Sequence, residues 1–304
     1  MTTPGGATVR EGQTVTGTSR LARYVNFVKL PHTVFALPFA LTGVVLASRV
    51  APVTLSLVVW VVLAFTAARF AAMGFNRIAD RHLDARNPRT QMREIPSGAM
   101  SVAEASSSVV VASAVFIFAA WRINPLCLAL SPLALAWVLF YSFTKRFTRW
   151  AHLVLGLGLG IAPAGGYLAV TGQWSDPWWL LPALAVAVTT WVGGFDIFYA
   201  LPDTEFDQSH GLHSVPANMG VPRALTVARG LHATTIAALA AAGAGAHAGW
   251  LYFAGVAVAA AILAYEHSLV SAEDQSRLDA AFFSMNGILS VTFFVFVLAE
   301  RVFQ

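Results

Sequence analysis

Two acidic groups with the same internal spacing stand out in this chain. The first consists of Asn76, Asp80 and Asp84, and the second of Asp203 and Asp207, with successive members four positions apart. On a helix, this spacing places side chains above one another on one face. Carboxylates arranged in this way repel each other, so the pattern lowers stability unless a cation binds there. Oxygen ligands without cysteine favour Mg²⁺, which usually also contacts substrate phosphates.

Basic residues are interleaved with these acids. Those in or near the two groups are Arg77, Arg81, Arg86, Arg89, Arg93, Lys145 and Arg146. A guanidinium group matches phosphate oxygens with two parallel hydrogen bonds, so acids combined with arginines favour a diphosphate held by metal ions and by arginines. The same arginines also agree with a second interpretation, because lysine and arginine concentrate in the inner loops of membrane proteins.

The composition indicates an integral membrane protein. Of the 304 residues, 57% are hydrophobic and only 11% are charged, and the mean hydropathy is +0.65. Such a chain has too little polar surface for a water-soluble body of this size. Apolar segments, most of them near the length of a membrane-spanning helix, cover 30–48, 50–68, 105–121, 123–144, 153–175, 177–195, 230–265 and 280–299.

The segment 230–265 is too long for one span. Its Gly/Ala-rich middle, 241–249, predicts a tight turn between two helices, so we expect an all-α bundle of nine transmembrane helices. Residues 1–20 are polar, which predicts a disordered tail before a single transmembrane domain over 21–304. The single Cys127 permits no internal disulfide and matches no metal-ligand spacing.

The distribution of basic residues predicts the orientation of the chain. If the N-terminus is cytoplasmic, most of the 19 lysines and arginines fall in cytoplasmic segments, as the positive-inside rule requires. The second, fourth and sixth helices then end on the cytoplasmic face of the inner or plasma membrane, and these ends contain the two acidic groups and Lys145. The polar connections 84–100 and 203–221 leave from the same face. We therefore expect one covered pocket there.

Motifs around these residues resemble those of the UbiA family of membrane prenyltransferases. They are Asn76-Arg-Ile-Ala-Asp80-Arg-His-Leu-Asp84, followed by Asn87-Pro-Arg-Thr90 and Arg93-Glu-Ile-Pro-Ser-Gly98; Tyr141-Ser-Phe-Thr-Lys145-Arg146-Phe-Thr148; and Asp196-Ile-Phe-Tyr199-Ala-Leu-Pro-Asp203-Thr-Glu-Phe-Asp207 with Gly211 and Ser214. The resemblance extends from Lys29 to Gly287, which is nearly the whole chain.

The resemblance implies nine helices around a central cavity, Mg²⁺ bound between aspartate-rich motifs, and transfer of a prenyl group from its diphosphate to an aromatic ring. Carried over residue by residue, it assigns the metal to Asn76, Asp80, Asp84, Asp203 and Asp207. It assigns the diphosphate to Arg93, Lys145 and Arg146, with Arg77, Arg81 and Arg89 as further candidates, and places Asp196 and Tyr199 at the reacting groups. The aromatic candidates for stabilising an allylic cation are Tyr141, Phe143, Tyr167 and Tyr199.

Departures from the family pattern concern the aromatic acceptor. Arg77 stands where many members have aspartate, and Ser209 and His213 stand where the 4-hydroxybenzoate type usually has lysines. This part of the sequence resembles a branch linked to the futalosine route to menaquinone, whose acceptor would be a hydroxynaphthoate. The expected partners are a polyprenyl diphosphate, a small aromatic acid of ubiquinone or menaquinone biosynthesis and membrane lipid, with no nucleic acid and no obligate protein partner.

Two other functions agree with part of the pattern. A transporter would use the acids as a cation or proton relay, and the run Gly156-x-Gly158-x-Gly160 is typical of its unwound helices. That function predicts acids distributed across the depth of the membrane, whereas here they concentrate at one rim. A CDP-alcohol transferase would need one compact Asp-Gly/Ala-Arg cluster, and this sequence has two distant acidic groups instead.

Overall fold

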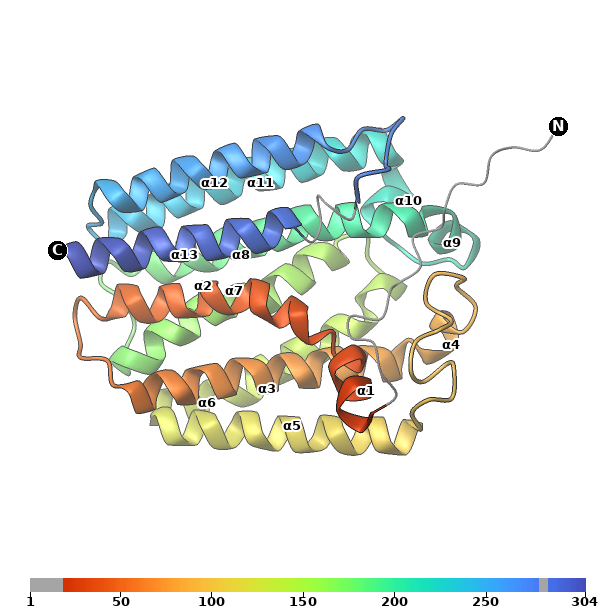
Figure 1. The fold of residues 1–304 in the computed structure, drawn as a ribbon, viewed down its shortest axis with the longest axis horizontal. Helices are drawn as coiled ribbons and strands as arrows, with labels where there is room; N and C mark the ends of the chain where they lie inside the picture. The colour runs from red at the N-terminus through yellow and green to blue at the C-terminus, as the bar shows by residue number, and fades with distance from the viewer. Residues whose placement is uncertain (1–18, 279–283) are drawn as a thin grey trace.

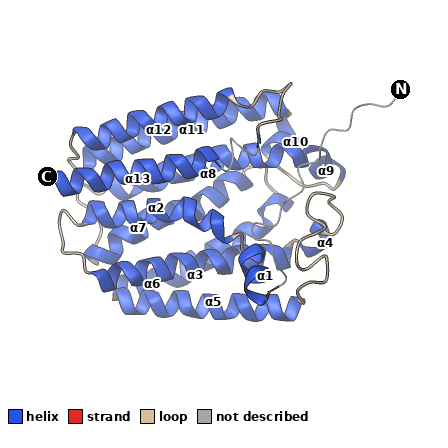
Figure 2. Ribbon diagram, in the orientation of Figure 1, coloured by secondary structure: helices blue, strands red, loops and turns tan. Residues whose placement is uncertain are grey.

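The protein is a bundle of long helices that run side by side (Figure 1). The computed structural model describes residues 19–278 and 284–304, and the regular elements of these residues are all helices, which confirms the all-α class (Figure 2). The long helices are α2 (Leu30–Ala47), α3 (Leu55–Ala79), α5 (Val102–Ile123), α6 (Pro125–Phe140), α7 (Ala151–Thr171), α8 (Leu180–Ala200), α11 (Val221–Gly245), α12 (Trp250–Ser268) and α13 (Asn286–Phe303). The short elements are α1 (Arg20–Phe27), α4 (Arg81–Asp84), η1 (Tyr141–Arg146), η2 (Leu201–Asp203), α9 (Thr204–Ser209) and α10 (Val215–Met219). The predicted tail over 1–20 lies almost entirely outside the described residues.

Eight helices of the described residues are long and apolar enough to cross a membrane. α2 is a further long helix, and Ala36–Ala47 is its apolar part. The predicted count of nine spans therefore stays a prediction. The predicted turn within 230–265 is confirmed, because α11 and α12 are separate helices. Apolar side chains such as Val110 and Leu133 are exposed on the bundle, as expected where helices contact lipid.

A cluster of aromatic rings occupies the centre of the bundle. Trp191 on α8 is 1% exposed, and its ring centroid lies 4.7 Å from that of Phe39 on α2. Phe39 stacks on Phe293 of α13, and Phe293 contacts Tyr252 of α12 edge to face. Such aromatic pairs contribute about 0.5–1.5 kcal/mol each beyond the burial of their area. The rings therefore hold α8 against α2, α12 and α13.

Two glycines let α7 and α8 approach each other closely. A Cβ atom on Gly156 would lie 2.2 Å from the Thr189 carbonyl oxygen, and one on Gly160 would lie 2.5 Å from the Thr189 hydroxyl oxygen. A larger residue at either position would push the two helices apart. Because α7 is continuous over Ala151–Thr171, the glycine run is a packing surface and not the unwound helix that a transporter would need.

The first acidic group lies where α3 ends. Asp80 follows this helix with φ −96° and ψ 5°, outside the helical region, and the chain then forms the single turn α4. Asn76, Asp80 and Asp84 therefore do not share one continuous helix, which corrects the prediction from their spacing. The N–H of Asp84 still donates to the Asp80 carbonyl oxygen at 2.8 Å, so these two aspartates remain one turn apart.

The second acidic group lies beyond the end of α8. Pro202 has no N–H and cannot continue the α-helical hydrogen bonding, so the chain passes through η2 into α9. Asp203 is the last residue of η2, and Asp207 lies in α9. The helices that precede the two acidic groups thus end on the same side of the bundle, next to α4, α9 and α10 and opposite the C-terminus (Figure 1).

Candidate active site

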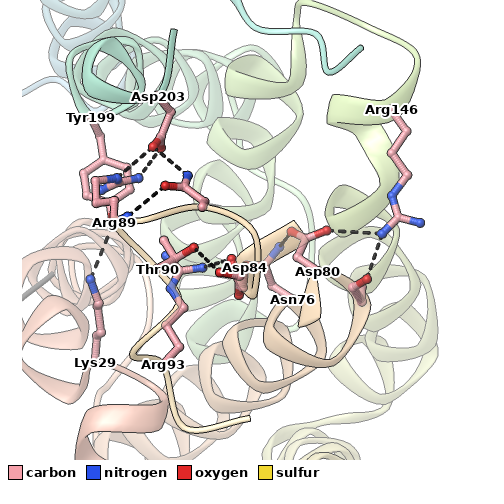
Figure 3. Close-up of polar contacts among 12 residues, drawn as sticks. Lys29, Asn76, Asp80, Asp84, Arg89, Thr90, Arg93, Arg146, Tyr199 and Asp203 are labelled. Carbon is pink, nitrogen blue, oxygen red and sulfur yellow. Dashed lines mark hydrogen bonds and ion pairs between the residues drawn. The ribbon is translucent and has the colours of Figure 1, made fainter. Parts of the chain in front are cut away.

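Polar residues from four parts of the chain meet at one end of the bundle, which we call the acidic end. They come from the end of α3 with α4, from the connection 85–101, from η1, and from the end of α8 with η2 and α9. Figure 3 shows the connection 85–101 between the two acidic groups, with the side chain of Arg89 directed to Asp203 and that of Arg93 directed to Asp84. Segments far apart in the sequence therefore build one site.

The first acidic group is paired with basic residues. Asp80 accepts a hydrogen bond from Asn76 Nδ2 at 2.9 Å, and Arg146 Nη2 lies 3.2 Å from its other oxygen. Asp84 is buried, and its Oδ1 accepts a hydrogen bond from Arg93 Nη1 at 2.8 Å. Burial and then the negative charge of Asp84 raise the pKa of Asp80, although Arg146 acts in the opposite direction. The basic residues thus do not fully offset the cost of the negative charge.

Asp203 connects the second acidic group to the first. Its Oδ1 accepts hydrogen bonds from Asn87 Nδ2 and from Arg89 Nε, both at 2.9 Å, and Arg89 Nη2 binds Oδ2 (Figure 3). Because Asn87 and Arg89 follow shortly after α4, these bonds attach the first motif to the second. Nearby, Lys145 Nζ of η1 lies 3.9 Å from Asp207 Oδ2.

Two buried aspartate oxygens at the acidic end have no hydrogen-bond donor within the described residues. They are Oδ2 of Asp84 and Oδ2 of Asp207, in residues that are 6% and 2% exposed. A buried carboxylate normally uses both oxygens, because an unpaired one loses its hydration without compensation. Lys145 approaches only to 3.9 Å of the second oxygen. These oxygens therefore fit a bound cation, and oxygen donors suit Mg²⁺.

The acids do not form a closed metal cage. In residues 19–278 and 284–304, no three His, Cys, Asp or Glu side chains lie close enough to hold a metal ion by themselves. Mg²⁺ usually keeps several waters and binds one or two carboxylates together with substrate phosphates, so paired acids beside arginines suit a site shared with a diphosphate. The assignment to the metal stays a prediction for Asn76, Asp80, Asp84, Asp203 and Asp207.

Tyr199 lies close to two cations. The guanidinium group of Arg89 lies 4.5 Å from the ring centroid, and Lys29 Nζ lies 5.7 Å from it and donates to the Tyr199 hydroxyl at 3.4 Å (Figure 3). Lys29 is 7% exposed and adopts φ 45°, in the left-handed region that is unfavourable for lysine. Its place before α2 is therefore held by the surrounding contacts. Together they give an aromatic ring with one cation near its centre and a second at its hydroxyl group.

His152 is a site residue that the sequence did not reveal. Its Nδ1 lies 2.7 Å from Asp196 Oδ2, and the N–H of Val215 donates to its Nε2 at 3.2 Å. The side chain of His152 is 1% exposed, whereas that of Asp196 is 17% exposed. His152 and Asp196 are 44 positions apart, so no local spacing indicates the pair. A histidine at the edge of an apolar helix was the only available signal.

The remaining candidates have other surroundings. Arg77 is 4% exposed and belongs to the buried face of α3. Arg81 donates to the Ile78 carbonyl oxygen at 2.8 Å. Their assignment to the diphosphate stays a prediction. Among the aromatic candidates, Tyr167 packs in the hydrophobic core, away from the aspartates at the ends of the helices.

Sequence comparison places the chain among prenyltransferases. The model of the UbiA prenyltransferase family matches residues 36–288. A 4-hydroxybenzoate octaprenyltransferase of Methylobacillus flagellatus is 31% identical over 236 residues, which are 78% of this chain and 78% of the relative. Another, of Alkalilimnicola ehrlichii, is 32% identical over 254 residues, which are 83% of this chain and 85% of the relative.

Solved structures share the fold. The apo structure of a UbiA homolog from Aeropyrum pernix K1 is 32% identical and has a TM-score of 0.76, covering 90% of this chain and 97% of that one. A UbiA homolog from Archaeoglobus fulgidus bound to DMAPP and Mg²⁺ has a TM-score of 0.70 at 20% identity, covering 93% of this chain and 100% of that one. The protein therefore belongs to the UbiA prenyltransferase family and is an integral membrane enzyme that transfers prenyl groups.

Proposed function

We propose that this enzyme transfers a polyprenyl group from its diphosphate to an aromatic acid of quinone biosynthesis, in a reaction that depends on Mg²⁺. The observation that carries the proposal is the pair of buried oxygens without donors, Asp84 Oδ2 and Asp207 Oδ2. They lie beside several basic residues, and acids with arginines suit a metal diphosphate. The Archaeoglobus fulgidus homolog, whose structure holds DMAPP and Mg²⁺, is a precedent within the same fold.

The basic residues of the acidic end are placed to receive a diphosphate. Arg89, Arg93 and Arg146 each contact one carboxylate in this structure. Bound Mg²⁺ would neutralise the acids and stabilise the negative charge of the departing diphosphate as a Lewis acid. The three guanidinium groups would then turn to the diphosphate oxygens, which they match with paired hydrogen bonds. The positive charges of the arginines would thus be paired with carboxylates before the ligands bind and with the diphosphate afterwards.

The proposed reaction breaks one bond and forms another at C1 of the prenyl chain. The bond from C1 to the diphosphate oxygen breaks, and its electron pair leaves with the diphosphate, where the arginines stabilise it. C1 joins an electron-rich ring carbon of the acceptor, and that carbon then loses its proton to a base, for which Asp196 is the candidate. The surrounding apolar helices exclude water that would otherwise capture the allylic cation.

The proposed acceptor is a hydroxybenzoate or a hydroxynaphthoate. Two relatives at 31% and 32% identity have the name 4-hydroxybenzoate octaprenyltransferase. The Tyr199 ring, with Lys29 and Arg89 beside it, offers an aromatic surface and positive charge, which together suit an aromatic carboxylate. The departures at Ser209 and His213 support a hydroxynaphthoate as the second acceptor to test.

Transfer assays on purified protein test this function. Wild type, Asp80→Ala and Asp203→Ala would be assayed with a polyprenyl diphosphate and each aromatic acid, with Mg²⁺ or with a chelator. We expect Mg²⁺-dependent product from wild type and a loss of about a hundredfold or more in both variants. Glu205→Ala is the matched control, because Glu205 is an exposed acid between Asp203 and Asp207. Wild-type rates in the two aspartate variants would rule out the proposed metal sites.

The acidic end is proposed to face the cytoplasm, with the N-terminus on the same side. The support is the concentration of lysine and arginine in the segments at this end. In a Cys127→Ser background, a cysteine introduced by Glu205→Cys should react with a membrane-impermeant thiol reagent only from the cytoplasmic side. Gln173→Cys, at the exposed opposite end, is the control and should react only from the other side. The reverse labelling pattern would contradict this orientation.

A further inference from the structure

A fully buried histidine lies directly behind the proposed base. His152 is in the first turn of α7 and is 0% exposed. Its Nδ1 lies 2.7 Å from Asp196 Oδ2, and the carboxylate of Asp196 is the partly exposed member of the pair. One oxygen of Asp196 is therefore held by His152, while its carboxylate stays partly exposed and lies within electrostatic range of Lys145 on η1.

The hydrogen bond from Val215 determines the tautomer of His152. A backbone N–H only donates, so Nε2 of His152 must accept the bond from Val215 at 3.2 Å and has no proton of its own. The ring proton of His152 is then on Nδ1, where it is donated to Asp196 Oδ2. Asp196 thus accepts a hydrogen bond from His152 Nδ1–H, and the bond from the Val215 backbone keeps the imidazole in this tautomer.

The same histidine connects Asp196 to the connection that follows the second acidic group. Val215 begins α10, whose N-cap Ser214 accepts from the N–H of Ala217. The residue before Ser214 is His213, and its N–H donates to the Lys145 carbonyl oxygen at 2.7 Å. The segment 213–215 is therefore attached to η1 on one side and to His152 on the other. A change in the position of this segment would be transmitted to Asp196.

We infer that His152 is a positioning residue for prenyl transfer. It holds Asp196 Oδ2 so that the other oxygen, Oδ1, is directed to the acceptor and receives the proton that the ring carbon loses after the new carbon–carbon bond has formed. The electron pair of that C–H bond restores the aromatic ring, and the diphosphate has already left with the electrons of the C–O bond. This inference rests on the proposed function, and it assigns a role to a residue outside the metal and diphosphate groups.

Two substitutions separate the contact with Asp196 from the packing of the ring. His152→Leu removes both hydrogen bonds and replaces the imidazole by an apolar side chain of similar volume. In His152→Asn the amide nitrogen takes approximately the place of Nδ1 and can still donate to Asp196. We expect His152→Leu to lower kcat about ten- to a hundredfold with little change in the KM for the prenyl diphosphate. His152→Asn should recover most of that loss.

A second buried histidine provides the matched control. His232 on α11 is 2% exposed, and its Nε2 contacts the carbonyl oxygen of Trp191 on α8, so His232→Leu also removes a buried imidazole that packs against α8. It should alter thermal stability without the specific fall in kcat. Equal losses in His152→Leu and His152→Asn, or an equal fall in kcat in His232→Leu, would overturn the inference. If wild type itself fails to transfer prenyl groups, the proposed function has failed instead.

Discussion

The two ends of the bundle both bury carboxylates, but they satisfy them to different degrees. At the far end, which contains the C-terminus, Glu300 is 2% exposed and both of its oxygens have donors. Oε1 binds Arg49 and the N–H of Gly249, and Oε2 accepts from the N–H of Tyr252 at 2.6 Å. These bonds cap α12 and attach it to α13 and to the connection after α2. Glu300 therefore stabilises the fold.

At the acidic end, buried aspartates lack some of their hydrogen-bond donors. Asp84 and Asp207 each have one buried oxygen without a donor in the described residues. Such a group destabilises a protein by about 1–3 kcal/mol, so a carboxylate that served only the fold would be expected to have its donors. Among these three residues, hydrogen-bond donors to both oxygens distinguish Glu300, which stabilises the fold, from the two aspartates that are proposed to bind a ligand. Burial and charge alone do not separate them, because all three residues are buried.

The largest expected effect comes from Asp207→Asn. The asparagine keeps the shape of the side chain and removes the charge, so the proposed metal site should weaken while packing remains. We expect kcat for prenyl transfer to fall about a thousandfold, which is about 4 kcal/mol, with little change in thermal stability. The measurements are the transfer rate at saturating Mg²⁺ and a melting curve in detergent. An active but strongly destabilised variant would show that Asp207, like Glu300, stabilises the fold.

Glu300→Ala should give the opposite result. It leaves the Arg49 charge without its carboxylate in a largely buried position and removes the acceptor for two backbone N–H groups. Loss of one partner of a buried ion pair costs about 3 kcal/mol. The free energy of unfolding should fall by that amount, while the remaining folded protein should keep the proposed dependence on Mg²⁺. The double variant Arg49→Met with Glu300→Leu is the control, and it should recover part of the stability.

Part of this contrast could be predicted from the sequence. The spacing of Asp80 and Asp84, repeated by Asp203 and Asp207, indicated the candidate site, and the order of apolar segments indicated that both groups lie at one end. The long-range partners could not be predicted. Asp203 pairs with Arg89 over 114 positions and Glu300 with Arg49 over 251 positions, and packing of the whole bundle selects these pairs.

The interruption of the helix at the first acidic group also could not be predicted from the sequence. A regular spacing predicts a continuous helix, and nothing between Asn76 and Asp84 is a strong helix breaker. In the structure, Asp80 leaves the helical region while Arg146, from a distant segment, binds its carboxylate and the Ala79 carbonyl oxygen. The tertiary contact thus satisfies a carbonyl at the end of α3, which local periodicity does not reveal.

Ligand binding should stabilise only proteins with an intact acidic end. Mg²⁺ together with inorganic diphosphate, at about a hundred times its dissociation constant, should raise the free energy of unfolding by about 2.7 kcal/mol in wild type. Asp84→Asn should lose this gain, whereas Glu300→Ala should keep it from a lower starting point. Thermal melting with and without the two ligands measures the difference. Equal stabilisation of Asp84→Asn and wild type would place the ligand elsewhere.

The smallest expected effect is a gain in stability without function. Burial and the charge of Asp84 raise the pKa of Asp80 in the folded protein, so the stability that the neutral form contributes at low pH is lost as pH rises through that raised value. The asparagine of Asp80→Asn does not ionise, so this variant should avoid the loss. At neutral pH and without metal, its free energy of unfolding should be about 0.5 kcal/mol higher than that of wild type. Its rate of prenyl transfer should nevertheless be low. Melting curves from acidic to neutral pH in a chelator test this. If wild type instead gains stability relative to Asp80→Asn as pH rises, Asp80 is, like Glu300, a carboxylate that stabilises the fold. The aspartates proposed to bind a ligand in the first acidic group would then be reduced to Asp84.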